Sequence, residues 1–226
     1  MSSSIFKRRG TAVAAAVFAF VAFVMIVAAL LSEYWVMADL ERQVGNSTQK
    51  GGSKHFGMFK GVSKQDFGLG ARERDFKVID EFEGVANDDV MWATVGFSIL
   101  SLLMICIMIA LSCYNEFTKP DLTICGSIGI YICCGLAFFF VLTSVCLFAA
   151  LFEIQLKKNV LQPQDQKRGF SSTDKAQLGY SFWILLGSAG VLLICPLIIL
   201  MKNIHCTHYF KTRKHEISTV DGVMLY

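Results

Sequence analysis

The chain has 226 residues, of which 54% are hydrophobic and only 17% are charged, and its formal net charge is +3. Its mean hydropathy is +0.51, and this value together with the scarcity of charge argues against an ordinary soluble domain. The composition therefore indicates a membrane protein.

Four uncharged segments are each long enough to cross a bilayer, whose hydrocarbon core of about 30 Å requires roughly 20 apolar residues. We expect membrane helices at residues 11–31, 91–112, 126–152 and 179–201. The first follows three basic residues, as a signal peptide would. Its apolar stretch exceeds the roughly 7–15 residues of a signal h-region, so a retained helix is favoured.

Positive charge next to the first helix favours a cytoplasmic N-terminus, because Lys7, Arg8 and Arg9 directly precede it. The remaining order is then a first extracellular loop at 32–90, a cytoplasmic turn at 113–125, a second extracellular loop at 153–178 and a cytoplasmic tail at 202–226, with residues 1–10 also cytoplasmic. Asn46 opens an N-glycosylation sequon in the first loop, which fits this orientation. Trp35, Trp92 and Trp183 are expected at the headgroup level, near the outer helix ends.

Three segments of the first loop favour strands because they contain aromatic and β-branched residues and are separated by glycine-rich stretches. These segments are Tyr34–Leu40, His55–Lys60 and Asp75–Ile79. Isolated strands are marginal in water, so such a sheet is expected to pack on the helices or on a partner. The predicted fold class is an all-α membrane protein: a four-transmembrane-helix bundle with a small extracellular β-sheet.

The cysteine distribution excludes an extracellular disulfide framework, because none of the eight cysteines lies in either predicted outer loop. Most are expected to pack as small apolar groups. Cys206, Cys113 and Cys125 fall at the predicted cytoplasmic interface, where S-palmitoylation is the functional alternative.

The helices carry no ionisable group apart from cysteine and tyrosine, which argues against a pump or transporter. No His, Cys and carboxylate side chains share a helix face at a useful spacing. We therefore expect no enzyme, no catalytic residue, no metal site, no cofactor and no nucleic-acid partner.

The tail contains basic residues that can attract anionic lipid, each contributing about 1 kcal/mol. These are Lys202, Lys211, Arg213 and Lys214. The last residues, Met224, Leu225 and Tyr226, suit a PDZ-type scaffold, although many chains end in apolar residues by chance. Expected partners are membrane lipids and other membrane proteins or cytoskeletal scaffolds. Small residues in the helices serve packing within one chain or, as the alternative, a homo-oligomer.

Particular residues carry a family resemblance. They are Tyr114, Asn115, Pro120, Gly126, Gly129 and Tyr131 around the inner turn, Phe56, Gly57, Phe59 and Gly61 in the first loop, and Ser181, Phe182 and Trp183 at the start of the last helix. These residues follow one another along the chain as they do in the clarins, four-helix membrane proteins with a claudin-like layout. The chain therefore resembles the clarins and is most similar to the third clarin paralogue. It departs from claudins in lacking outer-loop cysteines, and Phe67 stands before the Gly68-Leu69-Gly70 stretch.

The resemblance implies a multi-pass plasma-membrane protein that organises or adapts membrane protein complexes without catalysis, in sensory or epithelial cells. A role in hearing transfers from better-known clarins only by analogy. Two alternatives remain open at this point: an auxiliary subunit of an ion channel, and a claudin-like cell–cell adhesion protein.

Overall fold

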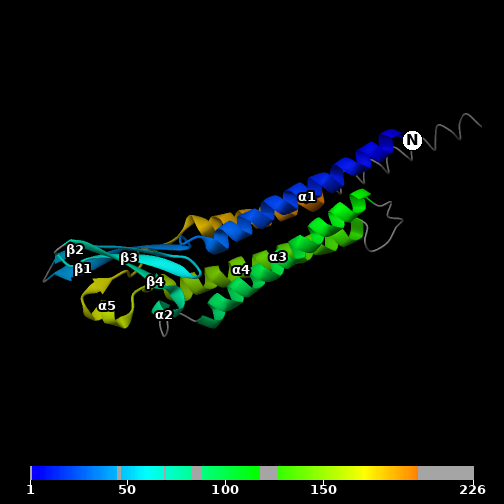
Figure 1. Ribbon diagram of the computed structural model, residues 1–226. Coiled ribbons are helices and arrows are strands. Elements are labelled where there is room, and N and C mark those ends of the chain that lie inside the picture. The colour runs from blue at the N-terminus through cyan, green and yellow to red at the C-terminus, as the bar shows by residue number, and fades with distance from the viewer. Residues whose placement is uncertain (1, 45–46, 69, 83–87, 118–126, 198–226) are drawn as a thin grey trace, which may run out of the picture.

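The computed structural model describes residues 2–44, 47–68, 70–82, 88–117 and 127–197, and it shows long helices with a sheet at one end (Figure 1). The long helices are α1 (Ser2–Leu31), α3 (Asp88–Phe117), α4 (Ser127–Leu151) and a helix at Tyr180–Leu197, called here the 180–197 helix. All four are long and apolar enough to cross a membrane. The mostly helical fold with four membrane-length helices and a small antiparallel sheet is therefore confirmed.

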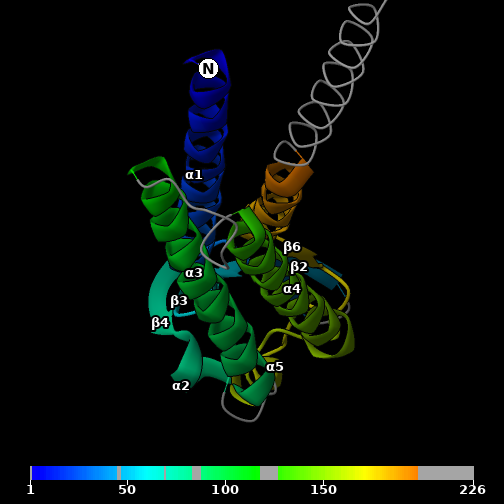
Figure 2. The same cartoon turned by 90° about the vertical axis from the view of Figure 1, so that its right-hand side faces the viewer.

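The helices run side by side (Figure 2), and small or hydroxyl-bearing side chains bring them together. Ala15, Ala19 and Ala22 of α1 are almost completely buried. Between α3 and α4, the hydroxyls of Ser98 and Ser144 are hydrogen-bonded at 2.8 Å. Because lipid offers no hydrophobic driving force for helix association, such close packing and hydrogen bonding hold a membrane bundle together.

The sheet consists of six antiparallel strands, here called the loop sheet. Its first four strands form a meander between α1 and α3: β1 (Val36–Val44), β2 (Ser47–Phe56), β3 (Lys60–Asp66) and β4 (Ala71–Lys77). Two short strands after α4, β5 (Phe170–Ser171) and β6 (Ala176–Leu178), both pair with β1. The described parts of residues 32–82 and 157–179, the first and second loops below, therefore share one sheet.

The short helices α2 (Val78–Phe82) and α5 (Pro163–Lys167) belong to these loops. The first follows β4 directly, and the second precedes β5. Leu40 of β1 forms a separate buried cluster with Leu161 and Phe170, so the second loop covers one face of the loop sheet.

The helix α4 reaches the loop sheet without a break because it continues as a π-helix, η1 (Phe152–Leu156). Residues Ile128–Leu156 form one candidate membrane span of 29 residues. At about 1.5 Å per residue it is roughly 43 Å long, which exceeds a hydrocarbon core of about 30 Å. Phe152 and Leu156 in its last turns are buried, so the end of this helix at the loop sheet is part of the protein core.

Trp35 differs from the sequence-based expectation, because it is completely buried rather than exposed to headgroups. Its indole nitrogen donates to the carbonyl oxygen of Ala29 at 2.6 Å, and its ring packs edge-on against Phe148 at 4.7 Å between ring centroids. Trp92 and Trp183 are instead 52% and 59% exposed, near the ends of their helices that adjoin the loop sheet. Trp35 is therefore a core residue that joins the first loop to the helices.

Candidate functional site

The loop sheet has two different faces. Along β1, Val36, Ala38 and Leu40 are buried, whereas Met37 and Asp39 between them are exposed. Because alternate residues of a strand point to opposite sides, this pattern defines a covered face and an open face. The covered face packs against the second loop and the helix ends.

A buried ammonium group lies on the covered face. Lys54 of β2 is only 1% exposed, and its Nζ atom donates to Glu81 Oε1 at 3.0 Å and to the carbonyl oxygen of Val160 at 3.2 Å. The ring centroid of Phe76 lies 4.7 Å from the same nitrogen. Burial lowers the pKa of Lys54 below its ordinary value of 10.5, and the Glu81 carboxylate opposes this shift.

The carboxylate of Glu81 continues this network. Arg74 donates to both of its oxygens, at 2.9 and 2.7 Å, while the side chain of Gln162 donates to its backbone carbonyl oxygen at 2.9 Å. Farther along the sheet, Gln65 donates to the buried Asp165 at 3.1 Å. These polar bonds join the first loop to the second, and we call the set Lys54, Arg74, Glu81, Val160 and Gln162 the Lys54 network.

Glycines allow the first loop to lie directly on the helix ends. A Cβ atom at Gly57 would stand 2.0 Å from the carbonyl oxygen of Ser32, and one at Gly179 would stand 2.0 Å from that of Tyr34. At Gly61 it would meet the side chains of Phe56 and Phe76 at 2.4 and 2.6 Å. Gly57 and Gly61 of the first-loop motif, and Gly179 before the last helix, thus occupy positions where no side chain fits.

The other motif residues of the first loop and of the 180–197 helix also lie at this junction. Phe56 is fully buried in the core, and Phe59 is 40% exposed. The backbone N–H of Ser181 donates to the carbonyl oxygen of Tyr34 at 3.2 Å. Phe182 packs near Phe148, with ring centroids 6.1 Å apart.

The open face carries a row of stacked rings. The ring of His55 lies parallel to that of Tyr34, with centroids 4.5 Å apart, and Tyr34 stacks on Tyr180 at 5.1 Å. Met37 and Val62 are the cross-strand neighbours of His55, and Met37 is 46% exposed. We call these five residues the open-face stripe. Aromatic residues and Met without charge are typical of the centre of a protein–protein interface.

The structure separates the remaining predicted residues rather than gathering them into a site. Cys113 and Tyr114 are exposed near the end of α3, Gly129 is buried on α4, and Tyr131 is half-buried there. Among the residues that the structure describes, no three His, Cys, Asp or Glu side chains are placed to hold a metal ion. Several of the predicted site and motif residues lie outside the part of the chain that the structure describes: Asn46, Pro120, Cys125, Gly126, Lys202, Cys206, Lys211, Arg213, Lys214, Met224, Leu225, Tyr226 and the side chain of Asn115.

Comparison with known proteins shows similarity to one group of proteins. A family model described as Clarin-2-like matches residues 6–200. Clarin-3 of Homo sapiens is 26% identical over 171 residues, which cover 73% of each chain. Clarin-3 of Mus musculus is 26% identical over 150 residues, covering 64% of this chain and 65% of the relative. Clarin-1 of Homo sapiens is 24% identical over 225 residues, covering 94% of this chain and 95% of the relative.

Proposed function

The chain belongs to the clarin family, and from this premise we propose that this tetraspan membrane protein is a non-enzymatic organiser that holds other membrane proteins against its open-face stripe. We place it in the plasma membrane of sensory or epithelial cells. Both termini are assigned to the cytoplasm and the loop sheet to the outside, in keeping with the basic residues before α1.

The observation that carries this proposal is the open-face stripe on a rigidly mounted sheet. The stripe contains no Asp, Glu, Lys or Arg and includes Met37 at 46% exposure, while the opposite face is fixed by the Lys54 network. A surface that does not rearrange loses less conformational entropy when a partner binds. The stripe therefore suits the stable capture of a partner's outer domain.

The inner side would supply attachment to the membrane and the cytoskeleton. Cys113 is exposed near the inner end of α3, where a palmitoyl chain would lie in the adjoining leaflet. In this proposal Cys125 and Cys206 are further acylation sites, the basic tail contacts anionic lipid, and Met224–Tyr226 binds a PDZ-type scaffold.

Proximity labelling in cells tests the organiser function, with Met37→Asp as the variant. It puts a charge in the open-face stripe and should lower the recovery of outer-domain partners by about tenfold, the loss of a single interface hot spot. Gln49→Asp is the matched control, because Gln49 is also an exposed residue of the loop sheet. If wild type recovers no reproducible membrane or scaffold partner, or if Met37→Asp recovers the same partners at wild-type surface levels, the proposal fails.

An auxiliary channel subunit is the second candidate, and exposed glycines favour it. Gly96, Gly135 and Gly190 face outward from three different helices, and a Cβ atom at each would meet nothing within 4 Å. Glycine lets a second helix approach closely in a membrane. Current recordings with co-expressed channels should show modulation that Gly135→Leu abolishes, and unchanged currents with wild type would exclude this function.

A further inference from the structure

The open-face stripe contains one side chain of the type whose charge ordinarily changes between about pH 5 and pH 8, and that side chain is His55. His55 is half-buried in the stripe, between its cross-strand neighbours on β1 and β3. The other three histidines of the chain belong to the tail, at His205, His208 and His215. Acidification on the side of the loop sheet would therefore act on the stripe through this one imidazole.

The imidazole of His55 is held in place by its aromatic neighbours. Its ring is tilted by only 3° from the ring of Tyr34, and Tyr34 is stacked in turn on Tyr180. A ring held flat in such a stack does not swing out to water when another protein covers it. A partner on the stripe would thus bury the imidazole, and burial disfavours the charged form of a titratable group.

Charges of both signs surround His55 on the open face. They are Lys60 and Lys64 on β3, Asp39 on β1 and, one strand farther away, Asp75 on β4. The first three occupy positions diagonal to His55, about 7–8 Å away in an antiparallel sheet, and Lys64 forms an ion pair with Glu73 at 3.3 Å. The remaining titratable groups on this side are the phenols of the stacked tyrosines. Two ammonium groups and one carboxylate at equal spacing do not compensate an imidazolium for the loss of water.

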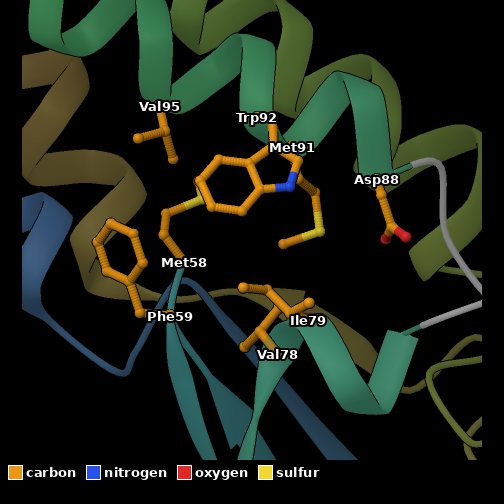
Figure 3. Close-up of a pocket in the computed structure, with 8 residues that line it drawn as sticks. All are labelled: Met58, Phe59, Val78, Ile79, Asp88, Met91, Trp92 and Val95. Atoms are coloured by element: carbon orange, nitrogen blue, oxygen red, sulfur yellow. The ribbon is translucent and has the colours of Figure 1, made fainter.

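Helix α3 approaches the loop sheet from the covered side. The two meet at a small pocket whose lining includes Phe59 of the first loop and one charged residue, Asp88 of α3 (Figure 3). Phe59 immediately precedes Lys60, so it points to the opposite face of the sheet from Lys60 and His55. The Asp88 carboxylate and the Lys54 network therefore lie on the covered side, and neither faces the imidazole.

We propose that the open-face stripe captures its partner while His55 is neutral and releases it when His55 is protonated. This inference rests on the organiser function proposed above and adds its regulation. A partner that covers the stripe removes water from the ring, so binding expels a proton from the imidazolium to solvent. Binding and proton release are then linked, and one proton changes a binding constant by at most about tenfold per pH unit. Partners are held at neutral pH and set free in an acidified compartment.

A wash experiment on the full-length chain in detergent tests this linkage. The chain is immobilised with the proteins it retains from cells, washed at about pH 7.4 or about pH 5.5, and the retained proteins are quantified by mass spectrometry. Only partners lost by Met37→Asp are counted, because these depend on the open-face stripe. Wild type should retain them about tenfold less at the lower pH, as expected for one proton bound over part of this range.

Substitutions at His55 fix the charge in each state. His55→Gln and His55→Phe are uncharged at both pH values, so the ratio of retention at pH 7.4 to that at pH 5.5 should fall to about one. His55→Lys carries a positive charge at both pH values and should also give a ratio of about one, with retention about tenfold below that of His55→Gln. Gln49→Lys adds the same charge at an exposed position of the same strand and should keep the pH dependence of wild type.

Two results would overturn the inference and leave the organiser function in place. One is equal retention of the Met37-dependent partners by wild type at both pH values. The other is a pH effect that persists in His55→Gln and His55→Phe, both shown to be monodisperse by gel filtration. Absence of any Met37-dependent partner at pH 7.4 would instead refute the organiser function, and this inference with it.

Discussion

Replacement of Glu81 by Gln should destabilise the protein more than replacement of Lys54 by Met. The Lys54 side chain is fully buried and that of Glu81 is only 6% exposed, with 3.0 Å between the charged atoms. Glu81→Gln removes the closest negative charge, while the Val160 carbonyl, the Phe76 ring and the more distant Asp165 carboxylate remain among the groups around the buried ammonium. Lys54→Met removes the buried positive charge, fills a similar volume, and leaves Glu81 paired with Arg74.

The expected magnitudes follow from this asymmetry. Removing one partner of a buried ion pair costs about 3–5 kcal/mol, while an apolar replacement of similar volume is often nearly neutral. We expect about 3 kcal/mol for Glu81→Gln, since Lys54 keeps its other contacts, and about 1 kcal/mol or less for Lys54→Met. The Arg74 pair adds little, because the Arg74 side chain is 58% exposed and solvent screens it.

Thermal unfolding of the purified protein in detergent measures these effects. At about 2–4 °C per kcal/mol for a chain of this size, Glu81→Gln should lower the Tm by roughly 6–12 °C. The double variant Lys54→Met/Glu81→Gln should be more stable than Glu81→Gln alone, because no buried ammonium remains. Equal losses for the two single variants that add in the double variant would refute this account of the Lys54 network.

Three further outcomes are expected. Because burial lowers the pKa of Lys54, the folded state binds fewer protons than the unfolded state between that pKa and 10.5, so stability rises with pH in this window. Raising the pH from about 7 to about 10 should therefore raise the Tm of wild type relative to that of Lys54→Met. A Tm difference that does not change with pH would contradict this expectation. Gly179→Ala should prevent correct folding, because its Cβ would stand 2.0 Å from a carbonyl oxygen. Gly96→Ala should instead stabilise α3 by up to about 1 kcal/mol. Gel filtration, which reports whether each variant is monodisperse, and the Tm distinguish the two outcomes. Asn46→Gln should abolish a glycosidase-sensitive mobility shift, and a wild-type chain without that shift would leave the outer position of the first loop unsupported.

The helical part of the fold was predictable because a bilayer imposes a length and a composition that single segments must satisfy alone. Strands obey no such local rule, since their positions depend on pairing with other strands. The segments Tyr34–Leu40 and Asp75–Ile79 overlap β1 and β4. The predicted strand His55–Lys60 is wrong, because it contains the turn between β2 and β3. Most of β2 and β3 is polar and glycine-containing, so the sequence favours a loop there. The two strands of the second loop were not expected at all.

The Lys54 network could also not be predicted from the sequence. A lysine in a polar loop is ordinarily a solvated residue, and its burial here depends on the carbonyl oxygen of Val160, which lies 106 positions away. One available signal was alternation, since Lys54 and the aromatic Phe56 point to the same face of a strand. The prediction for Trp35 was wrong for a related reason. Its position after a membrane helix favours the lipid headgroups, but its ring packs against Phe148 and its indole N–H donates to the Ala29 carbonyl inside the protein.

The length of α4 with η1 has a mechanical consequence. This helix of 29 residues begins at Ile128, at the end of the bundle away from the sheet, and its last turns are buried against the loop sheet. A rod longer than the hydrocarbon layer adapts to a thinner or thicker bilayer by changing its tilt. Such a change of tilt would rotate the open-face stripe relative to the membrane plane, so bilayer thickness would set the angle at which the surface proposed above for partner binding is presented.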